Sequence, residues 1–70
     1  MLVHLAGPID AATRARATAA LAAVDGVRSV RGSHRTPNLL IVYYDPRIAS
    51  TPEVLRTVQS QGFTARLVGF

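Results

Sequence analysis

Residues 5–13 read Leu5-Ala6-Gly7-Pro8-Ile9-Asp10-Ala11-Ala12-Thr13, and the other elements of the chain are arranged around this stretch. A short apolar run over residues 2–6 stops at Gly7-Pro8, a pair that marks turns. Asp10 then stands just before an alanine-rich segment, where a carboxylate can cap a helix N-terminus. The stretch therefore predicts a strand, a turn and the start of a helix, with any binding site at the turn.

Apolar periodicity and turn residues predict the remaining elements. A helix over residues 11–24 ends at Gly26, which suits the left-handed position after a helix. A second helix begins at Ser50 or Thr51 and ends at Gly62. Segments rich in β-branched and aromatic residues predict the other strands, over residues 27–33, 39–44 and 63–68, with a connection over residues 34–38.

The predicted order is strand, helix, strand, strand, helix, strand. It favours an α+β, ferredoxin-like βαββαβ fold, in which a four-stranded antiparallel sheet carries both helices on one face. The first and third strands are then central. The turn at residues 7–10, the hairpin at residues 34–37 and the Gly62-Phe63 junction share one end of the molecule. At 70 residues, the chain is expected to form a single domain, residues 1–70.

Alternation along the strands assigns side chains to the two faces of this sheet. One set is predicted to point toward the helices: Val3, Leu5, Leu40, Val42 and Tyr44. The opposite, open face then carries Leu2, His4, Leu39, Ile41, Tyr43, Arg66 and Val68. Because exposed apolar patches mark protein–protein contacts, we predict a partner-binding surface that includes Ile41, Tyr43 and Val68.

The charge of the chain is strongly positive. All eight basic residues are arginine, against four acidic residues, which gives a net charge of +4 and a pI near 11.2. This balance favours an acidic protein surface, nucleic acid or anionic lipid as partner. A basic rim is expected near the first turn, formed by Arg14, Arg16, Arg31 and Arg35. The chain has no cysteine, which excludes disulfides, thiolate nucleophiles and thiolate metal sites.

The sequence offers no basis for catalysis. It lacks a glycine-rich phosphate loop and any Ser/His/Asp or paired-carboxylate set that the fold could bring together. No apolar stretch approaches the ~20 residues that a membrane span requires. The first residues also lack the features of a signal peptide. We therefore expect a protein that is not an enzyme, does not insert into membranes and resides in the cytoplasm.

The chain resembles the heavy-metal-associated domains of copper chaperones and metal-transporting P-type ATPases. The residues that carry the resemblance extend over most of the chain: Gly7, Leu21, Val24, Gly26-Val27, Val42-Tyr43-Tyr44-Asp45-Pro46 and Gly62-Phe63-Thr64-Ala65. In that family the turn reads Gly-Met-Thr-Cys-x-x-Cys, and its two thiolates hold a soft metal such as Cu(I). Here Asp10 and Thr13 occupy the cysteine positions, and their oxygens are hard ligands. The resemblance therefore implies a degenerate domain that keeps the scaffold and has lost the soft-metal site.

Metal binding could survive on other ligands. Asp10 is predicted as the helix cap, with a hard-metal ligand as the alternative, and Thr13 is expected to complete the packing of the helix. An Asp10/His34 pair at the end of the sheet, or His4, would suit Zn(II), Ni(II) or Cu(II). Because two ligands are too few for a tight site, we expect no cofactor beyond a weakly bound divalent metal ion.

Three functions remain open. The first is non-catalytic docking, either onto an acidic or apolar protein surface or onto a second copy in a homodimer. The resemblance implies a metal-transporter domain as one such protein partner. The second is metal binding or delivery through Asp10 with His34 or His4. The third is nucleic-acid binding on the open face, where Tyr43 and His4 would stack bases as in RNA-recognition folds. The missing Arg/Lys-Gly-aromatic motif disfavours this third function.

Overall fold

A computed structural model describes residues 1–33 and 35–68 of the chain. The elements are β1 (Leu2–Leu5), α1 (Ala11–Ala22), β2 (Val27–Ser33), β3 (Thr36–Tyr44), α2 (Thr51–Ser60) and β4 (Ala65–Leu67). Their order confirms the βαββαβ chain that apolar periodicity predicts. Within the described residues, neither helix is long and apolar enough to cross a membrane.

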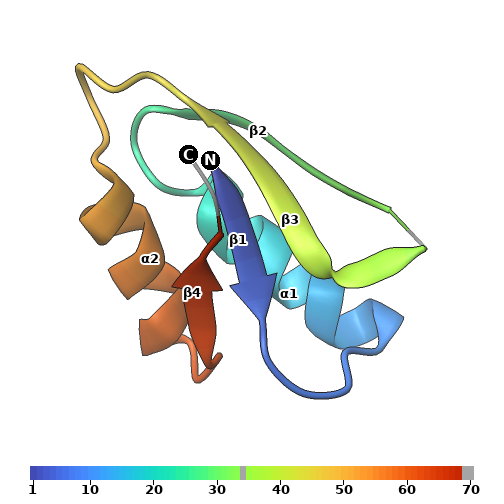
Figure 1. The fold of residues 1–70 in the computed structure, drawn as a ribbon. Coiled ribbons are helices and arrows are strands. Elements are labelled where there is room, and N and C mark those ends of the chain that lie inside the picture. The colour runs from blue at the N-terminus through green and yellow to red at the C-terminus, as the bar shows by residue number, and fades with distance from the viewer. Residues whose placement is uncertain (34, 69–70) are drawn as a thin grey trace.

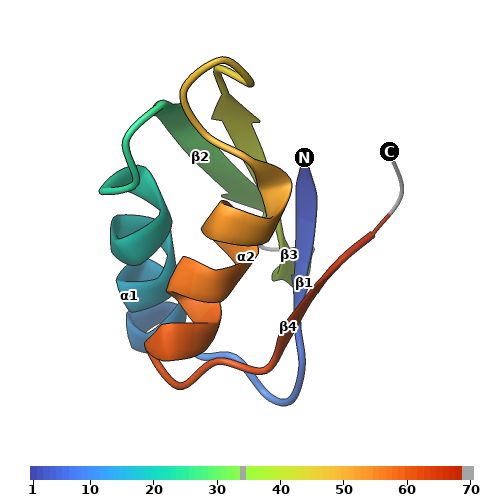
Figure 2. The ribbon, with the colours of Figure 1, turned by 90° about the vertical axis from the view of Figure 1, so that its left-hand side faces the viewer.

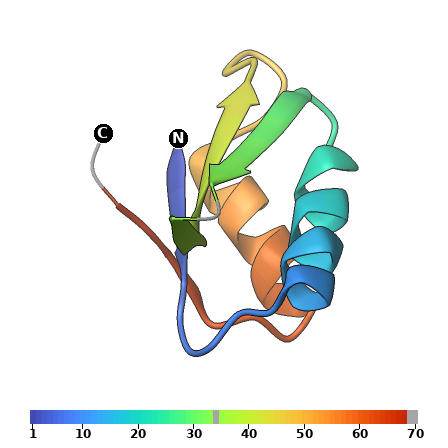
Figure 3. The ribbon, with the colours of Figure 1, turned by 90° about the vertical axis from the view of Figure 1, so that its right-hand side faces the viewer.

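The four strands form one antiparallel sheet in the order β2-β3-β1-β4, so β1 and β3 are central, as predicted. Both helices cover the same face of this sheet and leave the other face open (Figure 1). Figures 2 and 3 show the helices and the sheet from the side as two layers. The fold is therefore the predicted α+β, ferredoxin-like arrangement.

The helix α1 ends at Ala22 rather than at residue 24, and the larger differences from the predicted boundaries lie in β3 and β4. β3 begins at Thr36, so residues 36–38 are strand where the sequence predicts a connection. The ladder is irregular between Gly32 and Ser33 opposite this start, and strand ends and irregularities are where a proline such as Pro37 is tolerated. β4 is shorter than the predicted 63–68, because only single hydrogen bonds extend the pairing beyond it, from Ala6 N–H to Thr64 O (2.8 Å) and from Val68 N–H to Leu2 O (2.9 Å).

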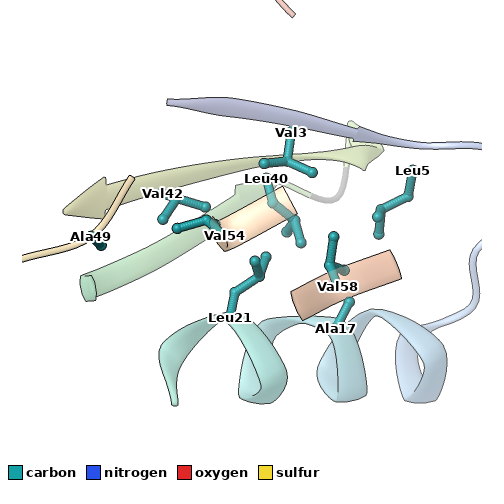
Figure 4. Close-up of a cluster of buried hydrophobic side chains, with 9 residues drawn as sticks. All are labelled: Val3, Leu5, Ala17, Leu21, Leu40, Val42, Ala49, Val54 and Val58. Atoms are coloured by element: carbon teal, nitrogen blue, oxygen red, sulfur yellow. The ribbon is translucent and has the colours of Figure 1, made fainter. Parts of the chain in front are cut away.

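The hydrophobic core lies between the sheet and the two helices (Figure 4). Its buried members are Val3, Leu5, Leu40 and Val42 from the strands, Ala17 and Leu21 from α1, Val54 and Val58 from α2, and Ala49 from the loop before α2. Tyr44 packs at the edge of this core and is half-buried. Ile41 and Tyr43, which alternate with the buried residues of β3, are 40% and 51% exposed. The predicted division of the sheet into an inner and an open face is therefore confirmed.

Each helix begins at a capping side chain. Asp10 caps α1, where its Oδ1 accepts a hydrogen bond from the Thr13 N–H at 2.7 Å. Ser50 caps α2 through a capping box: its Oγ accepts from the Glu53 N–H, and Glu53 Oε1 accepts from the Ser50 N–H, both at 3.3 Å. Ser50 is thus the cap and Thr51 the first helical residue, so local sequence fixes the start of both helices.

Asp45 follows β3 at the end of the sheet remote from the first turn. It is only 7% exposed. Arg47 donates three hydrogen bonds to the Asp45 carboxylate: the backbone N–H and Nε donate to Oδ1 (2.9 and 3.1 Å), and Nη2 donates to Oδ2 (2.8 Å). Arg28 Nη2 lies 3.6 Å from Oδ2. Hydrogen bonds from Arg47, helped by the charge of Arg28, lower the pKa of Asp45 to about 2. The charged carboxylate therefore organises the connection between β3 and α2.

Because the pKa of Asp45 is low, the free energy of unfolding is expected to fall as the pH falls into the acid range. The folded chain binds fewer protons at Asp45 than the unfolded chain, whose reference pKa is 3.8, so the stabilisation is present above about pH 4 and is lost toward about pH 2. We expect the urea midpoint of unfolding to fall over this range, and to fall less in Asp45→Asn. The control Asp25→Asn makes the same charge change outside the Arg28/Arg47 cluster and should keep the native pH profile. Equal flattening of both profiles would contradict the assignment to Asp45.

Candidate functional site

The first turn, residues 6–10, connects β1 to α1 at one end of the sheet (Figure 1). Gly7 has a φ of +85°, in the left-handed region that favours glycine, and no atom lies within 4 Å of where a Cβ would stand. Pro8 is exposed, whereas Ile9 is half-buried and packs against the core. The turn is therefore a solvent-exposed bend between an anchored strand and an anchored helix start.

Asn38, near the start of β3, holds the first turn. Its Nδ2 donates to the carbonyl oxygens of Leu5 and Gly7, both at 2.6 Å. A side-chain amide has two N–H donors, so one asparagine satisfies two carbonyls at once. The sequence prediction misses this role, because it places Asn38 in a connection. The only local signal is an asparagine after Pro37, which is typical of many turns.

Asp10 and Thr13, the two residues that the sequence resemblance aligns with cysteines, are in contact at the start of α1. The Thr13 N–H donates to Asp10 Oδ1 at 2.7 Å. Hydrogen bonds from the Thr13 hydroxyl and then from its N–H lower the pKa of Asp10, and the charge of Arg16 lowers it further. The carboxylate is thus held ionised as the cap of α1, with Thr13 as its direct partner.

Phe63 lies at the same end of the molecule as the first turn. The Arg16 guanidinium stands over its ring, with Cζ 5.6 Å from the ring centroid, within the range of a cation–π contact. Because Arg16 also acts on Asp10, this contact joins the α2–β4 connection to the start of α1. The predicted placement of the Gly62-Phe63 junction beside the first turn is confirmed.

His4 and Asp10 do not form a metal site together in the part of the chain that the structure describes. His34 lies outside the described residues, so the Asp10/His34 pair stays a prediction. His4 is opposite Leu39 and Arg66 and so stands on the open face, whereas Asp10 caps a helix on the other face. Among residues 1–33 and 35–68, no three His, Asp or Glu residues are grouped to hold a metal ion.

The four arginines predicted as a basic rim are divided between the two sides of the sheet. Arg14 and Arg16 lie on α1, in the helix layer. Arg31 is opposite Ile41 in the β2–β3 ladder and therefore stands on the open face. Arg35 is exposed in the β2–β3 connection. The open face thus has its own positive charges, Arg31 on one edge strand and Arg66 on the other.

Tyr43 and His4 share the open face but lie at different ends of it. His4 is opposite Leu39, and Tyr43 is four residues further along β3. At about 3.4 Å per residue, the two side chains are about 14 Å apart along the strand. They do not form the adjacent stacking platform that RNA-recognition folds use, so this geometry weighs against the nucleic-acid alternative.

The chain is similar in fold to several solved structures, whereas no family model and no curated protein matches its sequence. A copper-binding domain of a P-type ATPase superposes with a TM-score of 0.88 at 25% identity, over 99% of this chain and 92% of that one. The copper chaperone of Enterococcus hirae gives 0.84 at 18% identity, over 96% and 97% of the two chains. Oxidized MerP from Ralstonia metallidurans gives 0.83 at 18%, over 93% and 89%. The similarity in fold therefore covers nearly the whole chain.

Proposed function

From the premise that this chain is a cysteine-free form of the heavy-metal-associated fold, we propose that it is a non-catalytic protein-docking module without the thiolate metal site. The observation that carries the proposal is that hydrogen bonds within the chain already occupy the polar groups of the first turn. Asp10 stands in a cysteine position of the family and is engaged as a helix cap, with its Oδ1 2.7 Å from the Thr13 nitrogen. Asn38 satisfies the turn carbonyls of Leu5 and Gly7. These contacts stabilise the turn without a metal ion.

Ligand chemistry supports the loss of soft-metal binding. A carboxylate and a hydroxyl are hard oxygen donors, whereas Cu(I) prefers thiolates and thioethers. The chain has no cysteine, and its one methionine, Met1, precedes β1 and lies away from the turn. A docking role fits the surface better, because the net charge of +4 suits an acidic partner and Ile41 and Tyr43 expose apolar area.

Metal binding or delivery is the second candidate function. It is favoured by the similarity to a copper-binding domain of a P-type ATPase and to a copper chaperone. The same similarity suggests a domain of a metal transporter as the partner, both for docking and for metal delivery. The ligands would be Asp10 with His4 or His34. The placement of His4 and Asp10 on different faces of the sheet argues against that pair.

A metal titration of the native chain tests the proposal. Amide-resolved NMR spectra would be recorded with Cu(I) under anaerobic conditions, and then with Zn(II) and Ni(II). We expect no stoichiometric, localised shifts at residues 7–13, His4 or His34, because no thiolate is present and the Asp10 carboxylate is already engaged. Asp10→Ala serves as the control, since any weak effect of Zn(II) at the turn should disappear with this carboxylate. Stoichiometric shifts at the turn would overturn the proposal and favour metal delivery.

A further inference from the structure

The strand register arranges the open face in rows of side chains. Antiparallel neighbours that lie directly opposite project to the same side of a sheet. One row runs across the sheet from Arg31 on β2 through Ile41 on β3 to Leu2 on β1. The next row runs from Leu39 on β3 through His4 on β1 to Arg66 on β4. The centre of the face therefore carries three aliphatic side chains and His4, and an arginine stands on each edge strand.

A cavity lies at the centre of the open face. A cavity of about 170 Å³, open to solvent, is lined by Leu2, Arg31, Gly32, Thr36, Leu39 and Ile41. Gly32 lines the hollow with its backbone, because a Cβ at this position would point to the helix face, 3.1 Å from Leu40 Cδ2. A cavity of about 150 Å³ lined by aliphatic side chains is large enough to take up a benzene ring. The hollow is therefore of the size to accept one large aliphatic or aromatic side chain from a partner.

The charge of this face has one sign. Arg31 and Arg66 form no ion pair within residues 1–33 and 35–68. Asp10, Asp25 and Glu53 belong to the helix layer and its connections, and the carboxylate of Asp45 is occupied by Arg47 and Arg28. A partner that brings carboxylates to the two arginines would therefore be complementary to the face.

The spacing of the two arginines matches the width of a helix. β2 and β4 are the edge strands and are three strand spacings apart, about 14 Å. An α-helix with its side chains is about 10–12 Å wide, so it fits between the two edges. Arg66 is opposite His4 and Arg31 is in the row of Leu2, which offsets the arginines by two residues, about 7 Å along the strands. This offset is close to one helical turn of about 5.4 Å.

We propose that the open face is the docking site for an acidic amphipathic helix of a partner protein. One aliphatic or aromatic side chain of that helix enters the hollow between Leu2 and Ile41. Carboxylates on the two flanks of its apolar stripe pair with Arg31 and Arg66. This assignment rests on the proposed docking function, to which it adds the surface and the chemistry of the partner.

A second copy of the chain fits this face less well. A two-fold dimer places the same surface patch of both copies in contact. Two open faces would bring Arg31 and Arg66 of one copy against those of the other, with no carboxylate of either face between them. Repulsion of like charges at an interface costs affinity, so the face favours an acidic partner over itself.

A designed probe tests the surface. It is a synthetic helical peptide with leucines at helical spacing and glutamates on both flanks, and its matched control has lysine in place of every glutamate. The isotope-labelled full chain would be titrated with each peptide and followed by NMR. We expect the glutamate peptide to shift the amides of Leu2, Leu39 and Ile41, and the lysine peptide to cause no such shifts.

Variants with matched controls separate charge from packing. The double variant Arg31→Glu/Arg66→Glu should bind the glutamate peptide at least tenfold more weakly than the native chain does, and it should bind the lysine peptide. Arg56→Glu makes the same kind of change on an exposed position of α2 and should alter affinity less than threefold. Ile41→Ser should weaken binding, whereas Ile48→Ser, at an exposed position in the β3–α2 connection, should not. All these residues are exposed, and circular dichroism checks that each variant folds.

Each other outcome overturns the assignment. Shifts at the first turn, Arg16 and Phe63 would move docking to that end of the molecule, and would leave the docking function standing. Concentration-dependent association that Ile41→Ser abolishes would make a second copy the occupant. Salt-sensitive binding of a single-stranded oligonucleotide to the face would replace the protein partner. Absence of any peptide binding would rule out the acidic helix as the partner. The metal titration tests the proposed docking function separately from this result.

Discussion

Replacing Asp10 and Thr13 together by cysteine is expected to give the chain a stoichiometric Cu(I) site. The two residues are already neighbours at the start of α1, because the Thr13 N–H donates to the Asp10 side chain at 2.7 Å. Thiolates are the soft ligands that Cu(I) prefers, and a helix N-terminus lowers the pKa of a thiol. We expect Asp10→Cys/Thr13→Cys to retain one Cu(I) per chain through anaerobic gel filtration, and the native chain to retain none, as measured by metal analysis.

The control for this variant is Asp10→Ser/Thr13→Ser, which removes the same carboxylate without adding thiols. It should retain no Cu(I). If the cysteine variant folds and still holds no Cu(I), the shape of the turn rather than the type of ligand prevents binding. Adding Asn38→Ala would then show whether the hydrogen bonds to Leu5 and Gly7 keep the turn closed. Such a result would contradict the explanation of the lost site by missing thiolates alone.

Gly26→Ala is expected to be the most destabilising glycine substitution in the loops of the chain. Gly26 has a φ of +93°, and an added Cβ would lie 2.9 Å from two side-chain carbons of Ile48 and 3.0 Å from the Cβ of Ala49. The left-handed conformation costs a residue with a Cβ about 1–2 kcal/mol, and overpacking costs about 1–3 kcal/mol more. A 70-residue domain has a total stability of roughly 4–10 kcal/mol, so a sum of about 2–5 kcal/mol removes much of it.

Urea and thermal unfolding followed by circular dichroism measure this loss, which corresponds to a fall in Tm of about 8–40 °C. The matched control is Gly62→Ala. Gly62 has the same φ of +93°, but no atom lies within 4 Å of its Cβ position, so only the backbone term of about 1–2 kcal/mol applies. Equal losses in the two variants would show that the contact with Ile48 and Ala49 relaxes at no cost.

Local patterns were sufficient to predict the elements and the faces of the sheet. Strand alternation placed Val3, Leu40 and Val42 inside and Ile41 outside, because successive side chains of a strand point to opposite faces. Asp10 could be recognised as a cap from its place before an apolar, alanine-rich segment. The ends of β3 and β4 were less predictable, since they depend on hydrogen bonds to other strands rather than on their own residues.

The candidate site was only partly predictable for the same reason. Asp10 and Thr13 are three residues apart, so their contact belongs to one helix start and could be anticipated. The bonds of Asn38 to Leu5 and Gly7 join residues 33 and 31 positions apart. No local pattern carries such a contact, because it forms only when β1 and β3 pair in one register.

The amino-acid sequence is sufficient to predict the order of the elements, the positive charge and the absence of a thiolate metal site, since a chain without cysteine lacks that site in any fold. The neighbours of each side chain, in contrast, depend on the tertiary structure. It separated His4 from Asp10 and placed Arg31 and Arg66 on opposite edges of a hollow aliphatic face. The physical reason is that periodicity selects the face on which a side chain stands, whereas strand order and register select what stands beside it.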